Sequence, residues 1–133
     1  DDREDLQKRI HEYGLKRVEI TGFVNPIKYY QRASILLLTS EYEGFGLVIA
    51  ESMKFGVVPV VYNTYEAAED LIADGHNGVL IDKPFSIGVF SEVLRKLMDD
   101  KELLNDISRN AIKISKRFNI YTVANEWYQL FDD

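Results

Sequence analysis

Cysteine is absent from this chain of 133 residues, and histidine occurs at only two positions. Without cysteine, the chain can form neither a disulfide nor a cysteine-ligated metal site. His11 and His76 lie far apart in the sequence and lack the spacing of metal ligands. No apolar run approaches the ~20 residues that a membrane-spanning helix requires, and no signal peptide opens the chain. We therefore expect a soluble cytoplasmic domain.

Basic residues are also few, with 16 Lys and Arg against 22 Asp and Glu and a formal net charge of −6. Broad binding to nucleic acid needs a basic face, so this balance argues against that class of function. A small local anion site remains compatible with it. The apolar share of 46% and the aromatic share of 12% are typical of a folded core. The length suits one domain or part of a larger one.

The chain is organised around residues 34 to 56. The apolar run at residues 35–38 is short enough to be a buried strand. A polar turn with Gly44 and Gly46 follows it, and apolar residues then recur at helical spacing through residues 47–55. Glycines in such a turn let a ligand approach the backbone closely. This stretch therefore predicts a strand, a tight turn and a helix.

Outside this unit, stretches typical of strands alternate with stretches typical of helices. Such alternation predicts an α/β fold, with a parallel sheet and helices on both of its faces. Single glycines and polar clusters separate the expected elements. The expected strands are 18–21, 35–38, 57–61 and 79–81, and the expected helices are 2–13, 27–32, 47–55, 67–73, one that begins near Ser86, 100–117 and 120–131.

The domain is expected to cover residues 1–133, with the last helices, about 100–131, packing at its end. Both of these helices carry apolar residues on one face. The final helix is expected to bury Val123, Trp127, Leu130 and Phe131.

Two polar stretches follow expected strands, namely the turn at residues 43–46 and the loop at residues 63–66. In parallel sheets, ligands bind beyond the carboxyl ends of the strands. The backbone N–H groups of residues 45–47 are placed to bind a phosphate at the start of the helix. The carboxylates of Glu43 and Glu51 flank this position and suit sugar hydroxyls. Together these groups describe a site for a nucleotide sugar.

Each of these residues also has a plainer interpretation. Glu51 on a helix is more often a solvated or capping residue than a ligand-binding one, and Glu43 before a glycine turn is commonly only a turn residue. Phe45 between two glycines is as typical of a hydrophobic plug as of a substrate contact. The one basic residue near the turn is Lys54, late in the helix. Spacing alone leaves these alternatives open.

Residues 40 to 53 read Ser-Glu-Tyr-Glu-Gly-Phe-Gly-Leu-Val-Ile-Ala-Glu-Ser-Met. This string resembles the donor-binding core of the group 1 (family 4) retaining glycosyltransferases, whose signature is two glutamates separated by seven residues. Glu43 and Glu51 match that signature, with residues 44–50 between them. The resemblance covers nearly the whole chain. It continues at Gly22-Phe23-Val24, Gly56, Pro59-Val60-Val61, Asp70-Leu71-Ile72, residues 74–78 and Phe118.

The resemblance implies a fold and a set of roles. The family has the GT-B fold of two Rossmann-like domains, and this chain resembles the C-terminal, donor-binding one. Glu43 would be the catalytic residue that contacts the transferred sugar, and Glu51 would hold the ribose of the nucleotide. The implied contacts to sugar and diphosphate are Gly44, Phe45, Gly46 and Leu47, and the implied base-side residues are Gly22 and Phe23.

The resemblance also implies a reaction. A hexose would pass from a nucleotide-diphosphate sugar to a saccharide or lipid-linked acceptor with retention of configuration, in polysaccharide or glycoconjugate biosynthesis. We expect no cofactor and no metal, and the chain has no Asp-x-Asp motif. The full-length enzyme could sit peripherally on the inner membrane. The alternatives are a nucleotide-sugar epimerase, whose family lacks the Glu-Gly-Phe-Gly string, and a non-catalytic nucleotide-binding or interaction module.

The chain departs from the family pattern in two places. Nothing before Val18 matches the first two strand–helix units of the family's donor domain, whose basic residues hold the diphosphate, and the acceptor-binding domain has no counterpart. The chain therefore resembles a C-terminal fragment, inactive when isolated. The stretch from Asn63 to Asp70 replaces the usual Gly-Gly-x-x-Glu pattern. Because the two unmatched strands would lie between residues 18–20 and 35–38, we expect these two strands to pair directly or a dimer to cover the open edge.

Overall fold

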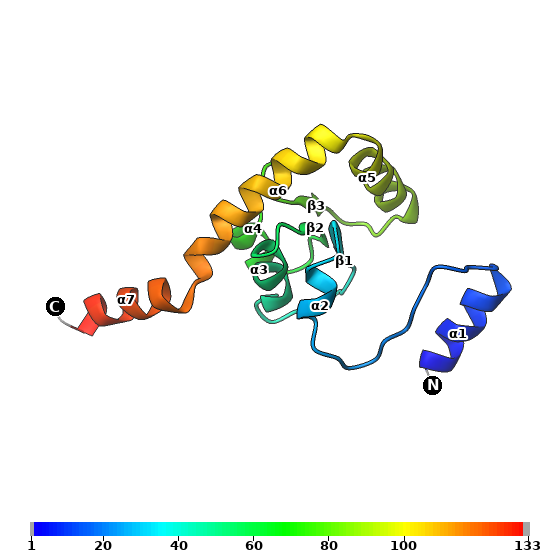
Figure 1. The fold of residues 1–133 in the computed structure, drawn as a ribbon, viewed down its shortest axis with the longest axis horizontal. Coiled ribbons are helices and arrows are strands. Elements are labelled where there is room, and N and C mark those ends of the chain that lie inside the picture. The colour runs from blue at the N-terminus through cyan, green and yellow to red at the C-terminus, as the bar shows by residue number, and fades with distance from the viewer. Residues whose placement is uncertain (1, 132–133) are drawn as a thin grey trace.

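The computed structural model describes residues 2–131 and shows a three-stranded parallel sheet with helices around it (Figure 1). Helices α1 and α7 extend from this body in opposite directions. In chain order the elements are α1 (Asp2–Glu12), α2 (Ile27–Tyr30), β1 (Ile35–Leu38), α3 (Leu47–Met53), β2 (Val58–Tyr62), α4 (Ala67–Leu71), β3 (Val79–Ile81), α5 (Ile87–Asp99), α6 (Lys101–Ser115), the 3-10 turn η1 (Lys116–Phe118) and α7 (Ile120–Phe131).

The strands lie in the order β1-β2-β3, and both pairs are parallel. Ile35 aligns with Val58 in the first pair, and Val60 aligns with Val79 in the second. Every residue of the central strand β2 is buried. Pro59, which has no N–H group to donate to a ladder, is the second residue of β2 and so lies near the strand's start.

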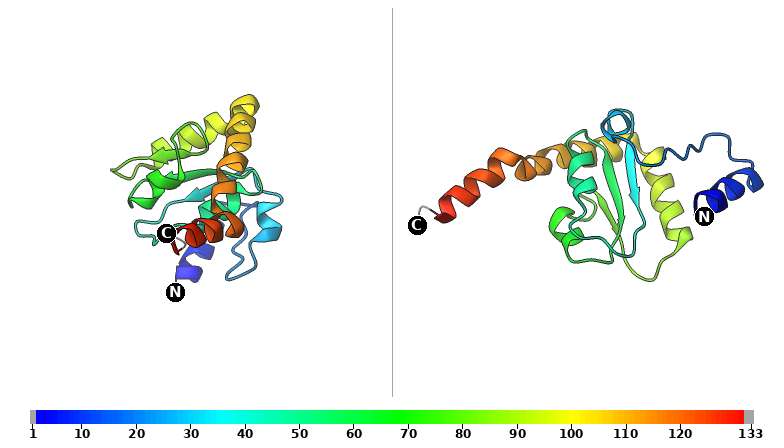
Figure 2. Two further views of the ribbon diagram at one scale, coloured as in Figure 1. Left: turned by 90° about the vertical axis from the view of Figure 1, so that its left-hand side faces the viewer. Right: turned by 90° about the horizontal axis from the view of Figure 1, so that it is seen from below.

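Helices cover both faces of the sheet, as the alternation of elements predicted (Figure 2). Side chains of β2 alternate between the faces. Val61 packs into a core with residues of α3, α4 and α6, whereas Val60 packs into a second core with residues of α5 and α6. The prediction of an α/β fold with a parallel sheet is therefore confirmed.

The expected strand at residues 18–21 does not form, and this prediction is wrong. Within residues 2–131, β1 pairs only with β2, so its other edge stays open and Leu37 is 44% exposed. The expected direct pairing of residues 18–20 with β1 is likewise wrong. A β-strand forms only where its backbone N–H and C=O groups pair with a neighbouring strand. The alternation of apolar and polar residues at 18–21 indicates an extended segment but does not show whether a partner strand lies beside it. Val18 consequently stays half exposed.

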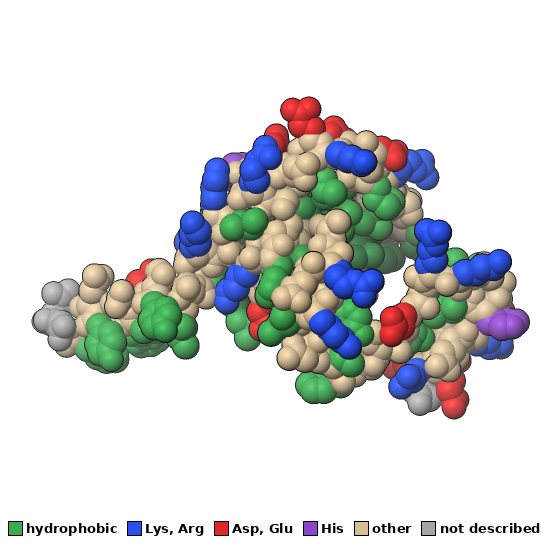
Figure 3. Space-filling view, in the orientation of Figure 1, with side chains coloured by type: hydrophobic (Ala, Val, Ile, Leu, Met, Phe, Trp, Pro, Cys, Tyr) green, Lys and Arg blue, Asp and Glu red, His purple; other side chains and the backbone are tan. Residues whose placement is uncertain are grey.

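The final helix forms over the expected range, but its apolar residues are not buried. Figure 3 shows hydrophobic side chains gathered along α7, away from the body of the molecule. The prediction of burial is wrong because helical periodicity reveals an apolar face but not whether a surface lies opposite it. The exposed fractions are 38% for Val123, 57% for Trp127, 72% for Leu130 and 78% for Phe131.

Within residues 2–131, none of the helices combines the length and the apolar character needed to cross a membrane.

Candidate functional site

The turn between β1 and α3 ends in a glycine that no other residue replaces without strain. Gly46 is buried and has φ 75° and ψ 43°, in the left-handed region of backbone conformation. A Cβ atom on it would lie 2.8 Å from the Tyr65 hydroxyl and 3.1 Å from Cδ1 of Ile49. Gly44, by contrast, has nothing within 4 Å of such an atom. Gly46 therefore sets the backbone path into α3.

Glu43 lies half-buried in this turn, and Tyr65 lies beneath it. The hydroxyl of Tyr65 is buried and has no hydrogen-bond partner. Burial raises the pKa of Tyr65 above its ordinary value, and the charge of Glu43 raises that pKa further. The raised pKa keeps Tyr65 neutral, so its hydroxyl is a hydrogen-bond donor held against Gly46 in the turn that contains Glu43.

The other implied residues of the turn differ in their surroundings. The ring of Phe45 meets the ring of Phe118 edge to face, with centroids 6.3 Å apart, yet Phe45 stays 46% exposed. Leu47, the first residue of α3, is 64% exposed. Phe45 thus anchors the turn on η1 through one side of its ring and leaves the rest accessible to a ligand.

Glu51 lies on α3 beside a separate pocket of about 380 Å³. The hydroxyl of the buried Tyr30 donates a hydrogen bond to Oε2 of Glu51 over 3.5 Å. Burial of Tyr30 raises its pKa, and the charge of Glu51 and this hydrogen bond raise the pKa further. The residues that line the pocket are Asn25, Pro26, Ile27, Tyr30, Glu51, Lys54 and Phe55.

Lys54 lines the Glu51 pocket. The expected base-side residues, Gly22 and Phe23, lie outside it. Gly22 takes a left-handed conformation with φ 69°, and the side chain of Phe23 is fully exposed. Neither lines the pocket, whereas Asn25 of the same loop does. This loop therefore contributes Asn25 to the pocket wall but neither Gly22 nor Phe23.

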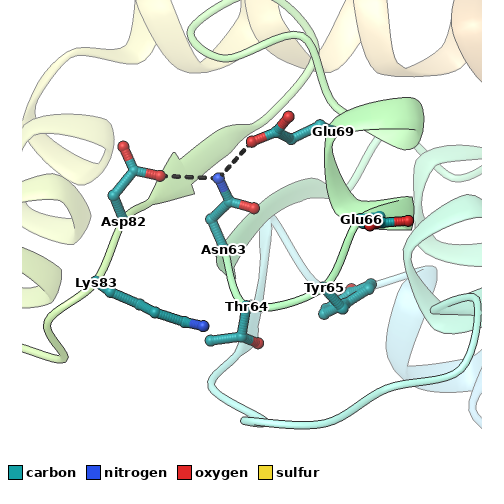
Figure 4. Close-up of a pocket in the computed structure, with 7 residues that line it drawn as sticks. All are labelled: Asn63, Thr64, Tyr65, Glu66, Glu69, Asp82 and Lys83. Atoms are coloured by element: carbon teal, nitrogen blue, oxygen red, sulfur yellow. Dashed lines mark hydrogen bonds between the residues drawn. The ribbon is translucent and has the colours of Figure 1, made fainter.

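A further pocket, of about 430 Å³, opens where β2 and β3 end (Figure 4). The side-chain amide of Asn63 donates to Oε1 of Glu69 over 2.9 Å and to Oδ1 of Asp82 over 2.8 Å. The loop at residues 63–66 is tied to the turn after β1, because Oγ1 of Thr64 donates to the backbone carbonyl of Ser40 over 3.1 Å. The turn and this loop thus form one edge of the sheet, as expected for parallel strands.

Sequence reasoning did not single out Tyr30, Tyr65 or Lys83, although Tyr65 lies in the loop at residues 63–66 that it placed beyond a strand's carboxyl end. Tyr30 donates a hydrogen bond to Glu51, Tyr65 lies against Gly46 of the turn that contains Glu43, and Lys83 lines the pocket at the end of β3. Tyr65 and Lys83 each follow a strand's carboxyl end, and that position was the available signal. No comparable signal marked Tyr30, which lies in a short helix.

No group of three or more His, Asp or Glu side chains that could hold a metal ion occurs within residues 2–131.

A model of the family described as "Glycosyl transferases group 1" matches residues 1–114. The chain belongs to this family. One relative is the GalNAc-alpha-(1->4)-GalNAc-alpha-(1->3)-diNAcBac-PP-undecaprenol alpha-1,4-N-acetyl-D-galactosaminyltransferase of Campylobacter jejuni, 31% identical over 129 residues, which are 96% of this chain and 35% of that protein. Another is the poly(glycerol-phosphate) alpha-glucosyltransferase of Bacillus subtilis, 29% identical over 96% of this chain and 19% of that protein.

Solved structures of group 1 glycosyl transferases and related proteins share the fold. The crystal structure of Anabaena HepE in complex with UDP and glucose superimposes with a TM-score of 0.85 at 26% identity, over 97% of this chain and 36% of that one. The C-terminal domain of the group 1 protein LpcC from Francisella tularensis gives a TM-score of 0.76 at 25% identity, over 90% of this chain and 64% of that domain. The chain spans about a third or less of the length of the two curated relatives.

Proposed function

We propose that this group 1 glycosyl transferase chain is the donor-binding part of a retaining enzyme that transfers a hexose from a nucleotide-diphosphate sugar to a saccharide or lipid-linked acceptor. The observation that carries the proposal is the placement of the two glutamates. Glu43 lies in the turn that precedes α3, Glu51 lies within α3, and a tyrosine hydroxyl accompanies each. The two carboxylates can therefore hold different parts of one extended donor.

The Glu51 pocket suits the nucleoside. A carboxylate accepts hydrogen bonds from two neighbouring hydroxyls, as a ribose presents them. The Tyr30 hydroxyl fixes the orientation of that carboxylate. Ile27 and Phe55 give the same pocket apolar walls against which a base can pack. Lys54 adds a positive charge that offsets the repulsion between Glu51 and a phosphate.

The glycine turn suits the diphosphate and the sugar. The diphosphate would meet backbone N–H groups of residues 45–47, and the transferred sugar would lie against Glu43. When the bond between the anomeric carbon and the diphosphate oxygen breaks, the nucleoside diphosphate leaves and positive charge develops on the sugar. The acceptor hydroxyl oxygen forms the new bond to the anomeric carbon, and its proton passes to the leaving nucleoside diphosphate. The carboxylate of Glu43 would stabilise that charge. The proposal requires no metal ion. The complex of Anabaena HepE with UDP and glucose supports this class of donor.

Two substitutions in the complete enzyme test the proposal. Glu43→Gln is expected to lower turnover by about 100-fold or more while changing donor affinity little, because its charge matters in the transition state. Glu51→Ala is expected to weaken binding of the nucleotide sugar by about 10- to 100-fold through lost hydrogen bonds. Titration with UDP-, GDP- and ADP-glucose would identify the nucleotide, and initial rates would give turnover.

Matched controls come from exposed glutamates. Glu41→Gln changes the same turn, and Glu92→Ala changes a helix, and neither is expected to alter binding or turnover. Unchanged kinetics in both Glu43→Gln and Glu51→Ala would contradict the site. Nucleotide binding by the complete enzyme without any sugar transfer would instead support a non-catalytic nucleotide-binding module.

A further inference from the structure

The hydroxyl of Tyr65 is an unusual feature of this fold. Within residues 2–131 it is the one buried side-chain oxygen or nitrogen that has no hydrogen-bond partner. Leaving a polar group buried and unpaired destabilises the folded state, so proteins pair almost all such groups. A phenylalanine would fill the same space without that penalty. We therefore expect the hydroxyl to find a hydrogen-bond partner in the ligand-bound state.

The surroundings of Tyr65 hold its hydroxyl in place. Its ring packs against the core formed by residues of α3, α4 and α6. Its carbonyl accepts a hydrogen bond from the N–H of Ala68 over 3.1 Å, and the preceding Thr64 is bonded to the turn after β1. Figure 4 shows the ring directed away from the Asn63–Asp82 pair. The hydroxyl consequently lies beneath the turn, against Gly46.

The group best placed to accept its hydrogen bond is Glu43. A bound ligand would lie outside the turn, whereas the Tyr65 hydroxyl has no accessible surface to offer it. Glu43 is half-buried in the same turn as Gly46, against which the hydroxyl lies, and its charge raises the pKa of Tyr65. A neutral phenol and a carboxylate form a short, charge-assisted hydrogen bond.

We infer that Tyr65 is a positioning residue, whose hydroxyl donates a hydrogen bond to the carboxylate of Glu43 when a nucleotide sugar occupies the turn. In the empty site, water can solvate the half-exposed carboxylate. A bound sugar displaces that water, and the buried donor then becomes the favoured partner. The bond holds the carboxylate toward the transferred sugar. This inference rests on the proposed function, because it assigns Tyr65 a task through Glu43.

The substitution Tyr65→Phe in the complete enzyme separates this role from a structural one. The melting temperature of the empty enzyme is expected to stay the same or rise, because an unpaired buried hydroxyl is removed. Turnover is expected to fall tenfold or more. Affinity for the nucleoside diphosphate and for the matching sugar nucleotide, the best bound of UDP-, GDP- and ADP-glucose, should both stay within about twofold, because Glu43 acts in the transition state. Tyr42→Phe, on an exposed residue of the same turn, is the control and should change none of these.

A double-mutant cycle tests whether Tyr65 acts through Glu43. Adding Tyr65→Phe to Glu43→Ala should cause no further loss of turnover. Three results would overturn the inference: unchanged turnover in Tyr65→Phe, a lower melting temperature with equal weakening of both ligands, or losses that multiply in the double variant. If Glu43→Ala alone has no effect on turnover, the proposed function itself fails, which is a different result from a silent Tyr65→Phe.

Discussion

Two separate features require glycine at position 46, which sets the backbone path of the turn into α3. Its left-handed backbone disfavours any side chain, and the Tyr65 hydroxyl and Ile49 occupy the space where a Cβ atom would lie. The left-handed backbone conformation can be predicted from the sequence, because glycines in a turn before a helix are typical of such conformations. The contact with Tyr65 cannot be predicted from the sequence, since Gly46 and Tyr65 follow different strands.

The substitution Gly46→Ala is therefore expected to reduce the free energy of unfolding by about 2–4 kcal/mol. Roughly 1–2 kcal/mol comes from the left-handed backbone, and the remainder from the crowding against Tyr65 and Ile49. Urea unfolding followed by circular dichroism measures the change. Gly44→Ala is the control, because its Cβ atom meets nothing within 4 Å and its φ is not positive; it should lie within about 0.5 kcal/mol of wild type. Equal losses in both variants would contradict this account.

The two glutamates of the site were predicted from the sequence, whereas the two tyrosines near them were not. The sequence pattern predicts Glu43 and Glu51 as site residues, and their roles stay predictions. Each lies beside a tyrosine hydroxyl, Tyr65 and Tyr30, that the sequence did not single out. A hydroxyl's partner depends on how strands and helices meet, and no local spacing encodes that.

At the scale of elements, sequence patterns located the segments that contact the core. Strands β1 and β3 match the expected ranges, and β2 is displaced by one residue. Burial on both faces makes the sequence of β2 almost continuously apolar, which is a strong signal. The partly buried strands β1 and β3 are apolar as well. The predictions that failed were the strand at residues 18–21 and the burial of the apolar face of α7. Both depend on a neighbouring surface, and within residues 2–131 none covers them.

Removing residues 120–133 tests whether α7 contributes to the fold. None of its described residues is buried, and the packing of Phe118 on Phe45 lies before the deletion. The free energy of unfolding is expected to stay within about 0.5 kcal/mol of the complete chain in urea titrations. Leu97→Ala provides the positive control, because that side chain is 2% exposed and its truncation should cost about 2–5 kcal/mol. A loss above about 1 kcal/mol on deletion would show that α7 packs against the body in solution.

Within residues 2–131, the two outer strands of the sheet, β1 and β3, each pair only with β2. Strand β1 offers unpaired backbone groups along its outer edge, and Leu37 is 44% exposed there. The expectation that a second copy covers this edge stays a prediction. In a two-fold dimer, the two β1 strands would run antiparallel and complete each other's hydrogen bonds. The net charge of −6 on each copy opposes the contact, and salt screens that repulsion.

We therefore expect sedimentation equilibrium to show a dimer that strengthens as salt is raised. Leu37→Lys should weaken the dimer by about tenfold or more, because it places a charge on each copy of the shared edge. Leu130→Lys is the matched variant on α7, where Leu130 is 72% exposed, and it should leave the dimer intact. The opposite result would assign the contact to the apolar face of α7. A monomer at all concentrations and salt conditions would show that the open edge of β1 does not bind a second copy.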